Sequence, residues 1–235
     1  MNKRMKGGIR YMFRYDTHVH TLQASACALS TGAELARAYK ERGYDGIFIT
    51  DHFFNGNTSV ASDITWKERV ELFCKGYEDA FEEGCKIGLD VFFGFEYAVG
   101  GADFLVYNID KKWLLEHEDI DKYSPSNAFS LLREAGGFVV HAHPFRQRDY
   151  ISHIKLCPEW VDAVEVYNGS HGKDSIFDSR AKWYAQSYNL PLTAGSDTHS
   201  VFSMYHAGFV SEKKLTHISE YKSLVTESKI MLFCD

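Results

Sequence analysis

Apolar segments of strand length recur along this 235-residue chain, and several of them end in a histidine or an acidic residue. The first segment is 15–20, and later ones lead into Asp51-His52, Glu96, His143 and Asp197. Most of these segments are separated by helical patterns, which cover 30–42, 65–86, 124–133, 176–188 and 218–225. Alternating helices and nearly continuous apolar strands predict an α/β domain with a mainly parallel sheet, covered by helices on both faces.

The placement of the polar residues predicts a barrel. In α/β barrels the carboxyl ends of the strands meet at one mouth, where active sites lie. Side chains that are distant in sequence can therefore lie close together there. No internal repeat, low-complexity tract or Pro/Gly-rich linker divides the chain. We therefore predict a single barrel domain over 1–235, with its site at the mouth.

The first strand carries a metal-binding pattern. Its side chains alternate between two faces, so Asp16, His18 and His20 share one face. Two neutral imidazoles at this spacing can bind one divalent metal, and a carboxylate in the row can accept the spare ring N–H of one of them. His141 and His143 repeat the spacing, and we expect them to face the same way. A lone His-x-His is equally consistent with two surface histidines, so the repetition carries the interpretation.

The full set of strand-end residues is too large for one ion. It comprises His18, His20, His52, His141, His143 and His199 with Asp51, Glu96 and Asp197. Mixed nitrogen and oxygen ligands suit Zn, Mn or Fe rather than Mg or Ca. Taken singly, Asp51-His52 could cap a helix, Glu96 could form a buried ion pair, and 195–199 could form a turn. Together they favour a site, in which Glu96 can bridge two ions through its two oxygens.

Five motifs resemble those of one known family. They are Asp16-Thr17-His18-Val19-His20, Ile49-Thr50-Asp51-His52, Gly94-Phe95-Glu96, His143-Pro144 and Gly195-Ser196-Asp197-Thr198-His199. In this order, over about residues 15–200, they resemble the PHP family, the polymerase-and-histidinol-phosphatase metal-dependent hydrolases. The resemblance implies a distorted (β/α)7 barrel, two or three metals at its mouth, and hydrolysis of phosphoesters. Two ions roughly 3.5–4 Å apart can share a hydroxide nucleophile.

The resemblance also implies a ligand assignment. The first metal would take His18, His20, Glu96 and Asp197; the second would share Glu96 and take His143; the third would take His52 and His199. Asp51 joins the predicted ligands through its motif, and Asp103 stands where many members have a histidine. Glu96, Asp197 and His199 are the predicted catalytic residues, and His199 or His52 could protonate the leaving oxygen if the third metal is absent.

One position departs from the family pattern. Ala26 stands eight residues after His18, where many members have a histidine or aspartate that serves the third metal. Alanine cannot ligate, so the third metal would lack this ligand. The neighbouring Cys27 is an alternative ligand, because a thiolate binds zinc well. A thiol that is only packed is the other interpretation.

Arg146 is the predicted substrate-binding residue. It lies three residues after His143, and Pro144 stiffens the turn between them. A guanidinium is well shaped to bind phosphate. Arg148 and Arg180 are expected on the surface or in structural roles.

We therefore predict hydrolysis of a small phosphomonoester or a short nucleotide. An amidohydrolase-type enzyme that cleaves a C–N bond is the alternative, but it needs a metal-bridging lysine where this chain has Glu96. A non-catalytic, metal-stabilised binding module is a third interpretation, disfavoured because buried ionisable groups are costly without a function.

Composition predicts the cellular context. The net charge of −6 gives no reason to expect general binding to nucleic acids or anionic membranes. The five cysteines are scattered without a C-x-x-C, so we expect them to be mostly reduced and buried. Residues 1–14 are basic but lack an apolar run of signal-peptide length, and no stretch approaches the ~20 apolar residues of a membrane span. These features predict a cytoplasmic protein.

Overall fold

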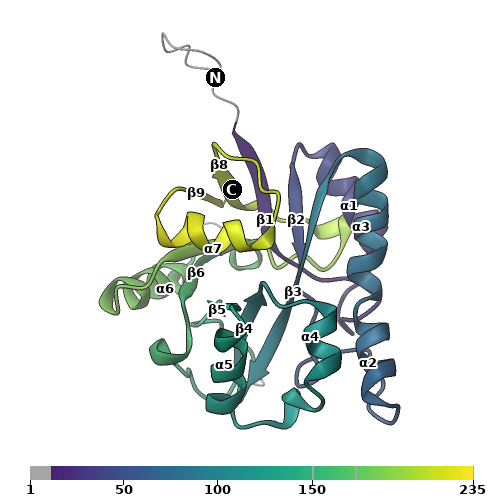
Figure 1. The fold of residues 1–235 in the computed structure, drawn as a ribbon. Helices are drawn as coiled ribbons and strands as arrows, with labels where there is room; N and C mark the ends of the chain where they lie inside the picture. Colours follow the sequence, from purple (N-terminus) through teal and green to yellow (C-terminus); the bar gives the residue numbers. More distant parts are fainter. Residues whose placement is uncertain (1–11, 150, 173, 235) are drawn as a thin grey trace.

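The computed structural model describes residues 12–149, 151–172 and 174–234 (Figure 1). Its strands are β1 (Phe13–Val19), β2 (Gly46–Ile49), β3 (Asp90–Val99), β4 (Ala102–Tyr107), β5 (Phe138–Ala142), β6 (Ala163–Asn168), β7 (Leu192–Gly195), β8 (Ala207–Ser211) and β9 (Met231–Cys234). Its α-helices are α1 (Gly32–Glu41), α2 (Trp66–Phe73), α3 (Lys75–Ile87), α4 (Lys111–Glu116), α5 (Pro125–Glu134), α6 (Ile176–Ser187) and α7 (Ile218–Thr226). Short 3₁₀ helices cover Ile120–Lys122, Pro158–Trp160, Gly169–His171 and Val201–Ser203.

The strands form one sheet that nearly closes into a barrel. Hydrogen bonds order them β7-β6-β5-β4-β3-β2-β1-β8-β9. The segment that follows β7 returns to the end of β1, where Val19 forms a parallel bridge with Thr198. The His20 N–H also donates to the Thr198 carbonyl at 2.9 Å. The predicted α/β class and barrel are confirmed.

The sheet is mixed, whereas the sequence predicted a mainly parallel one. The pairs β1/β2, β2/β3, β5/β6 and β6/β7 are parallel, and β3/β4, β4/β5, β1/β8 and β8/β9 are antiparallel. The cause of the first reversal is local. Gly100 and Gly101 join β3 to β4 with φ of 55° and 88°, and a two-residue hairpin of this kind needs positive φ at both positions.

This hairpin places Glu96 inside a strand rather than at its end. The sequence predicted a strand that leads into Glu96, but β3 runs on to Val99, because from Gly94 onward it pairs with β4. Its earlier part, Asp90 to Phe93, pairs with β2. Glu96 therefore lies just past the point where β3 leaves β2, and it forms an isolated bridge with His52.

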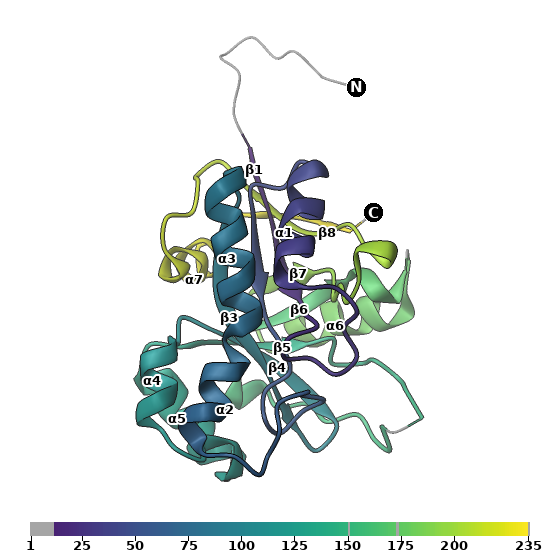
Figure 2. The same cartoon turned by 90° about the vertical axis from the view of Figure 1, so that its right-hand side faces the viewer.

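The predicted helix over 65–86 is two helices, because its halves pack on different partners. On α2, the Trp66 indole N–H donates to the Leu114 carbonyl of α4 at 2.7 Å. The short helix α4, which the sequence did not predict, is capped by the Asp110 side chain. In contrast, α3 packs along α1, as Figure 2 shows. The two halves separate at Cys74.

Close packing of α1 and α3 supports the base of the site. A methyl group on Gly32 would lie 2.2 Å from the Gly76 carbonyl oxygen, so the two helices touch backbone to backbone. A methyl group on Gly76 would lie 1.9 Å from Thr21 Oγ1 and 2.8 Å from Asp51 Oδ2. Helix α3 therefore presses directly on the loops that follow β1 and β2, and these loops carry candidate ligands.

No helix in the described ranges is both long and apolar enough to cross a membrane. The basic stretch over 1–11 lies outside the described residues. All five cysteines are free thiols. Cys74 and Cys157 are buried as expected, whereas that expectation was wrong for Cys27 and Cys85, which are exposed.

Candidate metal centre

The two histidines of the first motif are oriented so that both can bind one ion. Nε2 of His18, on β1, lies 3.0 Å from Nε2 of His20, just after β1. Each Nδ1 points the other way: that of His18 lies 2.9 Å from Glu165 Oε1, and that of His20 lies 3.1 Å from Ser25 Oγ. With Nδ1 carrying the proton, both Nε2 lone pairs face the same point, and only these are left for a metal.

The prediction that Asp16 orients one of these imidazoles was wrong. Its Oδ1 accepts from the backbone N–H groups of His18 and Ser196 at 3.1 and 3.0 Å, and its Oδ2 accepts from the Tyr39 hydroxyl at 2.7 Å. Burial outweighs these hydrogen bonds and raises the pKa of Asp16 to about 6. Asp16 thus ties β1 to the turn after β7, and Glu165 orients the His18 ring in its place.

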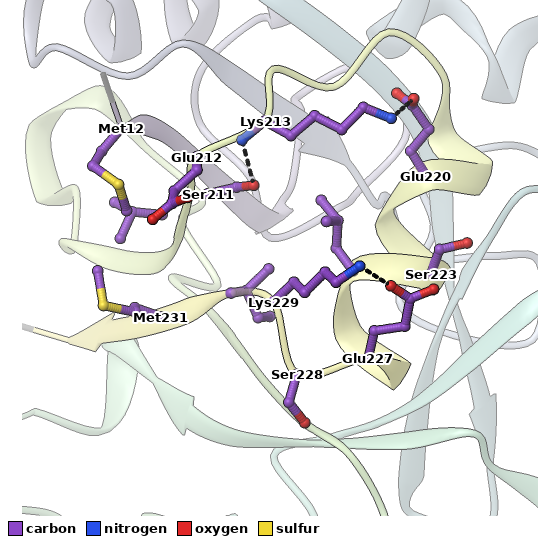
Figure 3. A pocket seen from close by; sticks show the side chains of 13 residues that line it. Met12, Ser211, Glu212, Lys213, Glu220, Ser223, Glu227, Ser228, Lys229 and Met231 are labelled. Atoms are coloured by element: carbon purple, nitrogen blue, oxygen red, sulfur yellow. Dashed lines mark hydrogen bonds and ion pairs between the residues drawn. The ribbon is translucent and has the colours of Figure 1, made fainter. Parts of the chain in front are cut away.

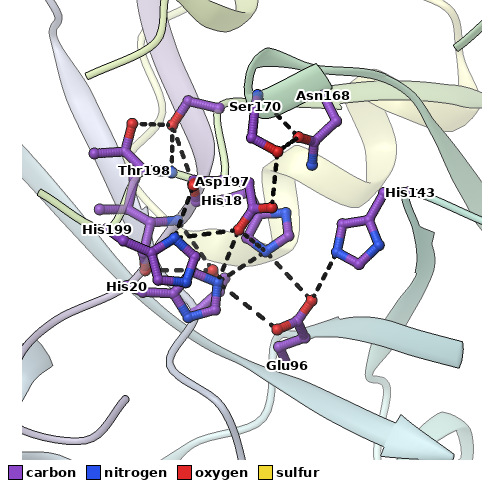
Figure 4. A network of polar contacts seen from close by, with 12 residues as sticks. His18, His20, Glu96, His143, Asn168, Ser170, Asp197, Thr198 and His199 are labelled. Atoms are coloured by element: carbon purple, nitrogen blue, oxygen red, sulfur yellow. Dashed lines mark hydrogen bonds and ion pairs between the residues drawn. The ribbon is translucent and has the colours of Figure 1, made fainter. Parts of the chain in front are cut away.

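Glu96 contacts several imidazoles, and Figure 4 shows its contacts with His18, His20 and His143. Its Oε1 is 3.1 Å from His143 Nε2 and 3.5 Å from His18 Nε2. Its Oε2 is 2.6 Å from His52 Nδ1 and 3.7 Å from His20 Nε2. Burial alone would raise the pKa of Glu96, but the charge of His52 and hydrogen bonds from His143 and His18 outweigh it and hold that pKa well below its usual value. One ionised carboxylate therefore faces both halves of the site.

Asp197 and His143 reach the site from strained backbone positions. Both residues follow a strand and have positive φ, 59° for Asp197 and 26° for His143. The Asp197 N–H donates to the His18 carbonyl at 2.9 Å, and the His143 N–H donates to Glu165 Oε2 at 3.1 Å. Such conformations cost on the order of 1–3 kcal/mol outside glycine and cluster at functional sites. Asp197 Oδ1 lies 3.4 Å from His20 Nε2.

Ligand-type atoms gather in four overlapping groups. The groups are His18/His20/Glu96, His18/His143/Asp197, Glu96/Asp103/His143 and His20/His52/His199, and within each group the ligand atoms all lie within 4.8 Å of one another. The donor set fits divalent transition metals, because it combines imidazole nitrogens with carboxylate oxygens. Two nitrogens on one such ion stand roughly 3.0–3.4 Å apart, from metal–nitrogen bonds of ~2.0–2.1 Å. The His18–His20 spacing fits this value.

The structure gives Asp51 a different role from the predicted one. Its Oδ1 accepts from the Thr21 N–H and the Ser25 hydroxyl, each at 2.6 Å, and its Oδ2 accepts from the Thr21 hydroxyl at 2.7 Å. Burial outweighs these hydrogen bonds and raises the pKa of Asp51 to about 6. Asp51 belongs to none of the four groups among the described residues. It holds the loop that carries Ser25, and Ser25 in turn holds His20.

The prediction that His141 and His143 face the same way was also wrong. Strand β5 ends at Ala142, and the positive φ of His143 turns its side chain out of the strand alternation. The His141 ring stacks on Phe104 at 4.8 Å and meets Tyr184 edge-on. Burial lowers the pKa of His141 to about 3. His141 is therefore a neutral core residue.

The Arg146 side chain contacts three residues around the candidate ligands. Its Nη2 pairs with Asp197 Oδ2 and donates to Ser170 Oγ at 3.1 Å. Its Nη1 lies 3.3 Å from His143 Nε2. Its side chain is 14% exposed, so the guanidinium lies between the ligand groups and solvent. Arg148 is exposed, as expected. Together with Arg146 it lines a cavity that opens at the barrel mouth.

This cavity, of about 630 Å³, opens at the barrel mouth and is lined by Cys27, His52, Asp103, Arg146, Arg148 and His199 among others. Cys27 Sγ lies 3.3 Å from His52 Nε2. Burial raises the pKa of Cys27, but hydrogen bonds with His199 and His52 outweigh it and lower the value to about 6. Burial lowers the pKa of His52, but the Glu96 charge and the Cys27 contact outweigh it and raise the value to about 11.

A larger cavity, about 680 Å³, lies between β8, α7 and β9 (Figure 3). Four of its charged side chains form two ion pairs, Lys213 with Glu220 and Lys229 with Glu227. None of the four ligand groups reaches it. The smaller cavity at the barrel mouth is therefore the candidate substrate site.

Sequence reasoning missed the residues that hold the ligands in place. Glu165, on β6, contacts His18 through one oxygen and accepts from the His143 N–H and Asn168 Nδ2 through the other. Ser170 donates to Asp197 Oδ2 at 3.2 Å. A usable signal was present for Glu165, because a lone carboxylate inside an apolar strand has to have partners when it is buried.

Known structures share this fold. The chain resembles a two-domain protein from Bacteroides vulgatus ATCC 8482 containing a predicted PHP-like metal-dependent phosphoesterase, with TM-score 0.69, 16% identity, and coverage of 95% of this chain and 65% of that one. This chain thus spans under two thirds of that protein. It also resembles PsfC from Pseudomonas syringae PB-5123, with TM-score 0.64, 18% identity, and coverage of 95% and 92%. A third similar structure is an amidohydrolase from Chromobacterium violaceum with bound sulfate and no metal, with TM-score 0.54, 15% identity, and coverage of 93% and 97%.

No protein-family model matches the sequence, and no curated protein matches it either. The structural likeness confirms the predicted PHP-type barrel as the fold of this chain.

Proposed function

We propose that this chain is a metal-dependent hydrolase that cleaves a phosphoester, with a small phosphomonoester or a short nucleotide as substrate. The observation that carries the proposal is the meeting of ligand-type atoms from β1, β3, β4 and the turns after β5 and β7 in overlapping groups. Arg146 lies against these groups at the edge of the open cavity. The likeness to a PHP-like phosphoesterase fold supports the proposal.

Two ions account for the inner groups. The first would be held by His18, His20, Glu96 and Asp197, and the second by Glu96, His143 and Asp103. Zn, Mn and Fe fit these nitrogen and oxygen ligands. When bound, such ions supply a water of lowered pKa and neutralise charge on phosphate oxygens.

The chain's own residues position the reaction. Glu96 Oε1 lies 3.5 Å from His18 Nε2 and 3.1 Å from His143 Nε2, so this carboxylate is placed to contribute to both centres when ions are bound. Glu165 keeps the proton of His18 on Nδ1, so that Nε2 faces the site. Arg146 presents guanidinium N–H groups to the phosphate. It must exchange its contact with Asp197 for the substrate, or share the two.

His199 is placed to move a proton. Its Nδ1 lies 2.9 Å from the Asp197 carbonyl oxygen and donates to it, while its ring lines the cavity. Burial lowers the pKa of His199, but its hydrogen bond with Cys27 and the charge of Asp197 outweigh this and raise the pKa above its usual value. The imidazolium can therefore donate to the leaving oxygen when no ion is held at His52 and His199.

Two other functions can be compared with phosphoester hydrolysis, namely C–N bond hydrolysis and non-catalytic metal binding. C–N bond hydrolysis is suggested by the likeness to the amidohydrolase. Against it, an amidohydrolase-type site is expected to need a metal-bridging lysine, and the sequence places Glu96 there. A non-catalytic binding module would not need so many buried ionisable side chains at one mouth.

The test is reconstitution of the metal-free chain with Mn²⁺, Zn²⁺ or Fe²⁺, followed by assays with phosphomonoesters, short nucleotides and amides. We expect phosphate release with at least one of these metals, and none from the chelated protein. Glu96→Gln, purified in the same way, controls for a contaminating phosphatase. Cleavage of amides alone would replace the proposal with C–N hydrolysis, and metal binding without any turnover would replace it with a binding module.

The cellular context stays a prediction. We propose that the protein acts in the cytoplasm on a small phosphorylated molecule and has no general affinity for nucleic acids or membranes. The net charge of −6 supports this proposal.

A further inference from the structure

The turn after β7 holds a candidate ligand in a conformation that needs support. Asp197 has a φ of 59°, and a residue other than glycine keeps such a conformation only where its surroundings determine it. Its Oδ1 lies 3.4 Å from His20 Nε2 and 3.6 Å from His18 Nε2 (Figure 4). Because metal–oxygen bonds are only ~2.0–2.2 Å long, a small change in this turn would take the carboxylate away from an ion that the two imidazoles hold.

Hydrogen bonds from side chains hold the residues on both sides of Asp197. The Ser196 N–H donates to Asp16 Oδ1 at 3.0 Å. The Ser196 hydroxyl oxygen accepts from the Thr198 N–H at 3.1 Å and lies 2.8 Å from Thr198 Oγ1. Asp16, Ser196 and Thr198 are all buried, so water does not compete for these contacts. The backbone before and after Asp197 is therefore fixed through Asp16 and Ser196.

Tyr39, on helix α1, joins these two side chains. Its hydroxyl donates to Asp16 Oδ2 at 2.7 Å and lies 3.0 Å from Ser196 Oγ. Its side chain is fully buried. Removing the hydroxyl would take a donor from a buried carboxylate, which is costly, and Asp16 would shift to find another donor. Because the same carboxylate holds the Ser196 N–H, that shift would displace the turn.

We propose that Tyr39 is a positioning residue for the first metal centre. Acting through Asp16 and Ser196, its hydroxyl holds the Asp197 carboxylate where it can share an ion with the two imidazoles of the first motif. This inference rests on the metal binding in the proposed function, and not on the reaction. It also gives α1 a part in the site, beside that of α3, which presses on the loops after β1 and β2.

The direct test is calorimetric titration of the metal-free protein with Zn²⁺ or Mn²⁺. Tyr39→Phe should weaken the binding of one ion about tenfold, at the lower end of the loss that follows removal of a residue that holds ligands. Tyr15→Phe is the matched control, because Tyr15 is also fully buried and its hydroxyl accepts from the Leu215 N–H at 2.8 Å, away from this turn.

Both substitutions should lower the Tm, but the control should leave metal affinity unchanged. A Tyr39→Phe protein with a lower Tm and wild-type metal affinity would give Tyr39 a structural role only and would overturn the proposal. An equal loss of affinity in Tyr15→Phe would also overturn it, since any buried hydroxyl would then have the same effect.

A double-variant comparison tests the route through Ser196. Ser196→Ala should also weaken metal binding, and the double variant with Tyr39→Phe should lose little more than the weaker-binding single variant, because both act through one network. Losses that multiply would mean that the two residues act independently, against the proposal. Where Tyr39→Phe does not fold, wild-type affinity in Ser196→Ala would overturn the proposal by itself.

None of these measurements uses phosphoester hydrolysis. A chain that hydrolyses no phosphoester, yet binds ions with an affinity that depends on Tyr39, refutes the proposed function and keeps this inference. Hydrolysis by a chain whose metal affinity is independent of Tyr39 does the reverse.

Discussion

The inner ligands and the barrel mouth use similar side chains but hold them in different ways. Inside, His18, His20 and Glu96 have side chains that are at most 1% exposed. At the mouth, His52 and His199 are 15% and 24% exposed, and they face an open cavity. The His18 ring is also fixed by Glu165 from β6, and the His20 ring by Ser25 from the loop that follows it.

Under the proposed function, this difference lets one barrel hold ions firmly and exchange substrate. Buried ligands with fixed ring orientations set where the ions lie, and hydrogen bonds from other elements offset the cost of burying them. At the mouth, Arg146 and His199 line the open cavity, where the proposed function has them meet the substrate and its leaving group. Substitutions inside should therefore remove metal and activity together, whereas substitutions at the mouth should lower activity with the inner ions in place.

The largest expected effect is at the shared carboxylate. Glu96→Gln should lower kcat/KM by about 10³-fold, or ~4 kcal/mol, and His199→Ala by only about tenfold. Glutamine lacks the charge that balances two ions, whereas His199 serves only the mouth. Steady-state kinetics with metal analysis of each variant provides the check. An equal loss in both variants, with metal content unchanged, would break the distinction between the two regions.

Next comes the phosphate contact. Arg146→Ala should lower kcat/KM about ten- to a hundredfold, because a charge-assisted hydrogen bond contributes ~1.5–3 kcal/mol. Metal content should stay the same, since arginine is not a ligand. Arg148→Ala is the matched control, from the same cavity, and should have little effect. If Arg146→Ala matches wild type on every phosphoester cleaved, the assigned role is wrong.

A substitution at Glu165 tests how much metal binding by the inner ligands depends on residues that only hold those ligands in place. Glu165→Gln should weaken metal binding about 10–100-fold, the usual cost of losing such a partner. The amide nitrogen of glutamine would have to face the N–H groups of His18, His143 or Asn168. Calorimetric metal titration measures the effect, and the exposed Glu159→Gln is the control. Unchanged affinity would mean that the His18 ring is held by packing alone.

The smallest effect at the site is expected for Asp51. Asp51→Asn should lower the free energy of unfolding by about 2 kcal/mol, since an amide faces donors from Thr21 and Ser25. For a chain of this size that is a Tm decrease of roughly 4–8 °C in the metal-free protein. Metal stoichiometry should not change. If a metal ion is lost with little change in Tm, Asp51 is a ligand after all.

Much of the candidate site was predictable, because its histidines and carboxylates follow apolar strand patterns that can be recognised in the sequence. His18, His20, His143 and Asp197 each lie at the end of an apolar strand pattern, and barrels bring such ends together. The residues that hold them were not predictable in this way. Glu165 meets His18 across 147 positions in sequence, on a strand that is not its neighbour in the sheet. That contact depends on the barrel closing, which no local pattern contains.

The errors have equally local causes. The predicted parallel order first fails where Gly100 and Gly101 reverse the chain between β3 and β4. This reversal depends on the backbone angles of these two residues. His141 was grouped with His143 by the two-residue period of a strand, but β5 ends between them. Asp51 has a carboxylate and follows an apolar strand, as the candidate ligands do. Its Oδ1, however, accepts hydrogen bonds from Thr21 and Ser25 in the loop after β1.

The central claim is that the inner groups hold at least two ions that share Glu96. Anomalous diffraction from crystals grown with Mn²⁺ or Zn²⁺ measures this directly. We predict one peak within ~2.0–2.2 Å of ligand atoms from His18, His20, Glu96 and Asp197, and a second at the same distance from Glu96 and His143. The occupancy of both should fall in Glu96→Gln. A metal-saturated crystal with no peak beside Glu96, or with a single ion that Glu96 does not touch, would contradict the account.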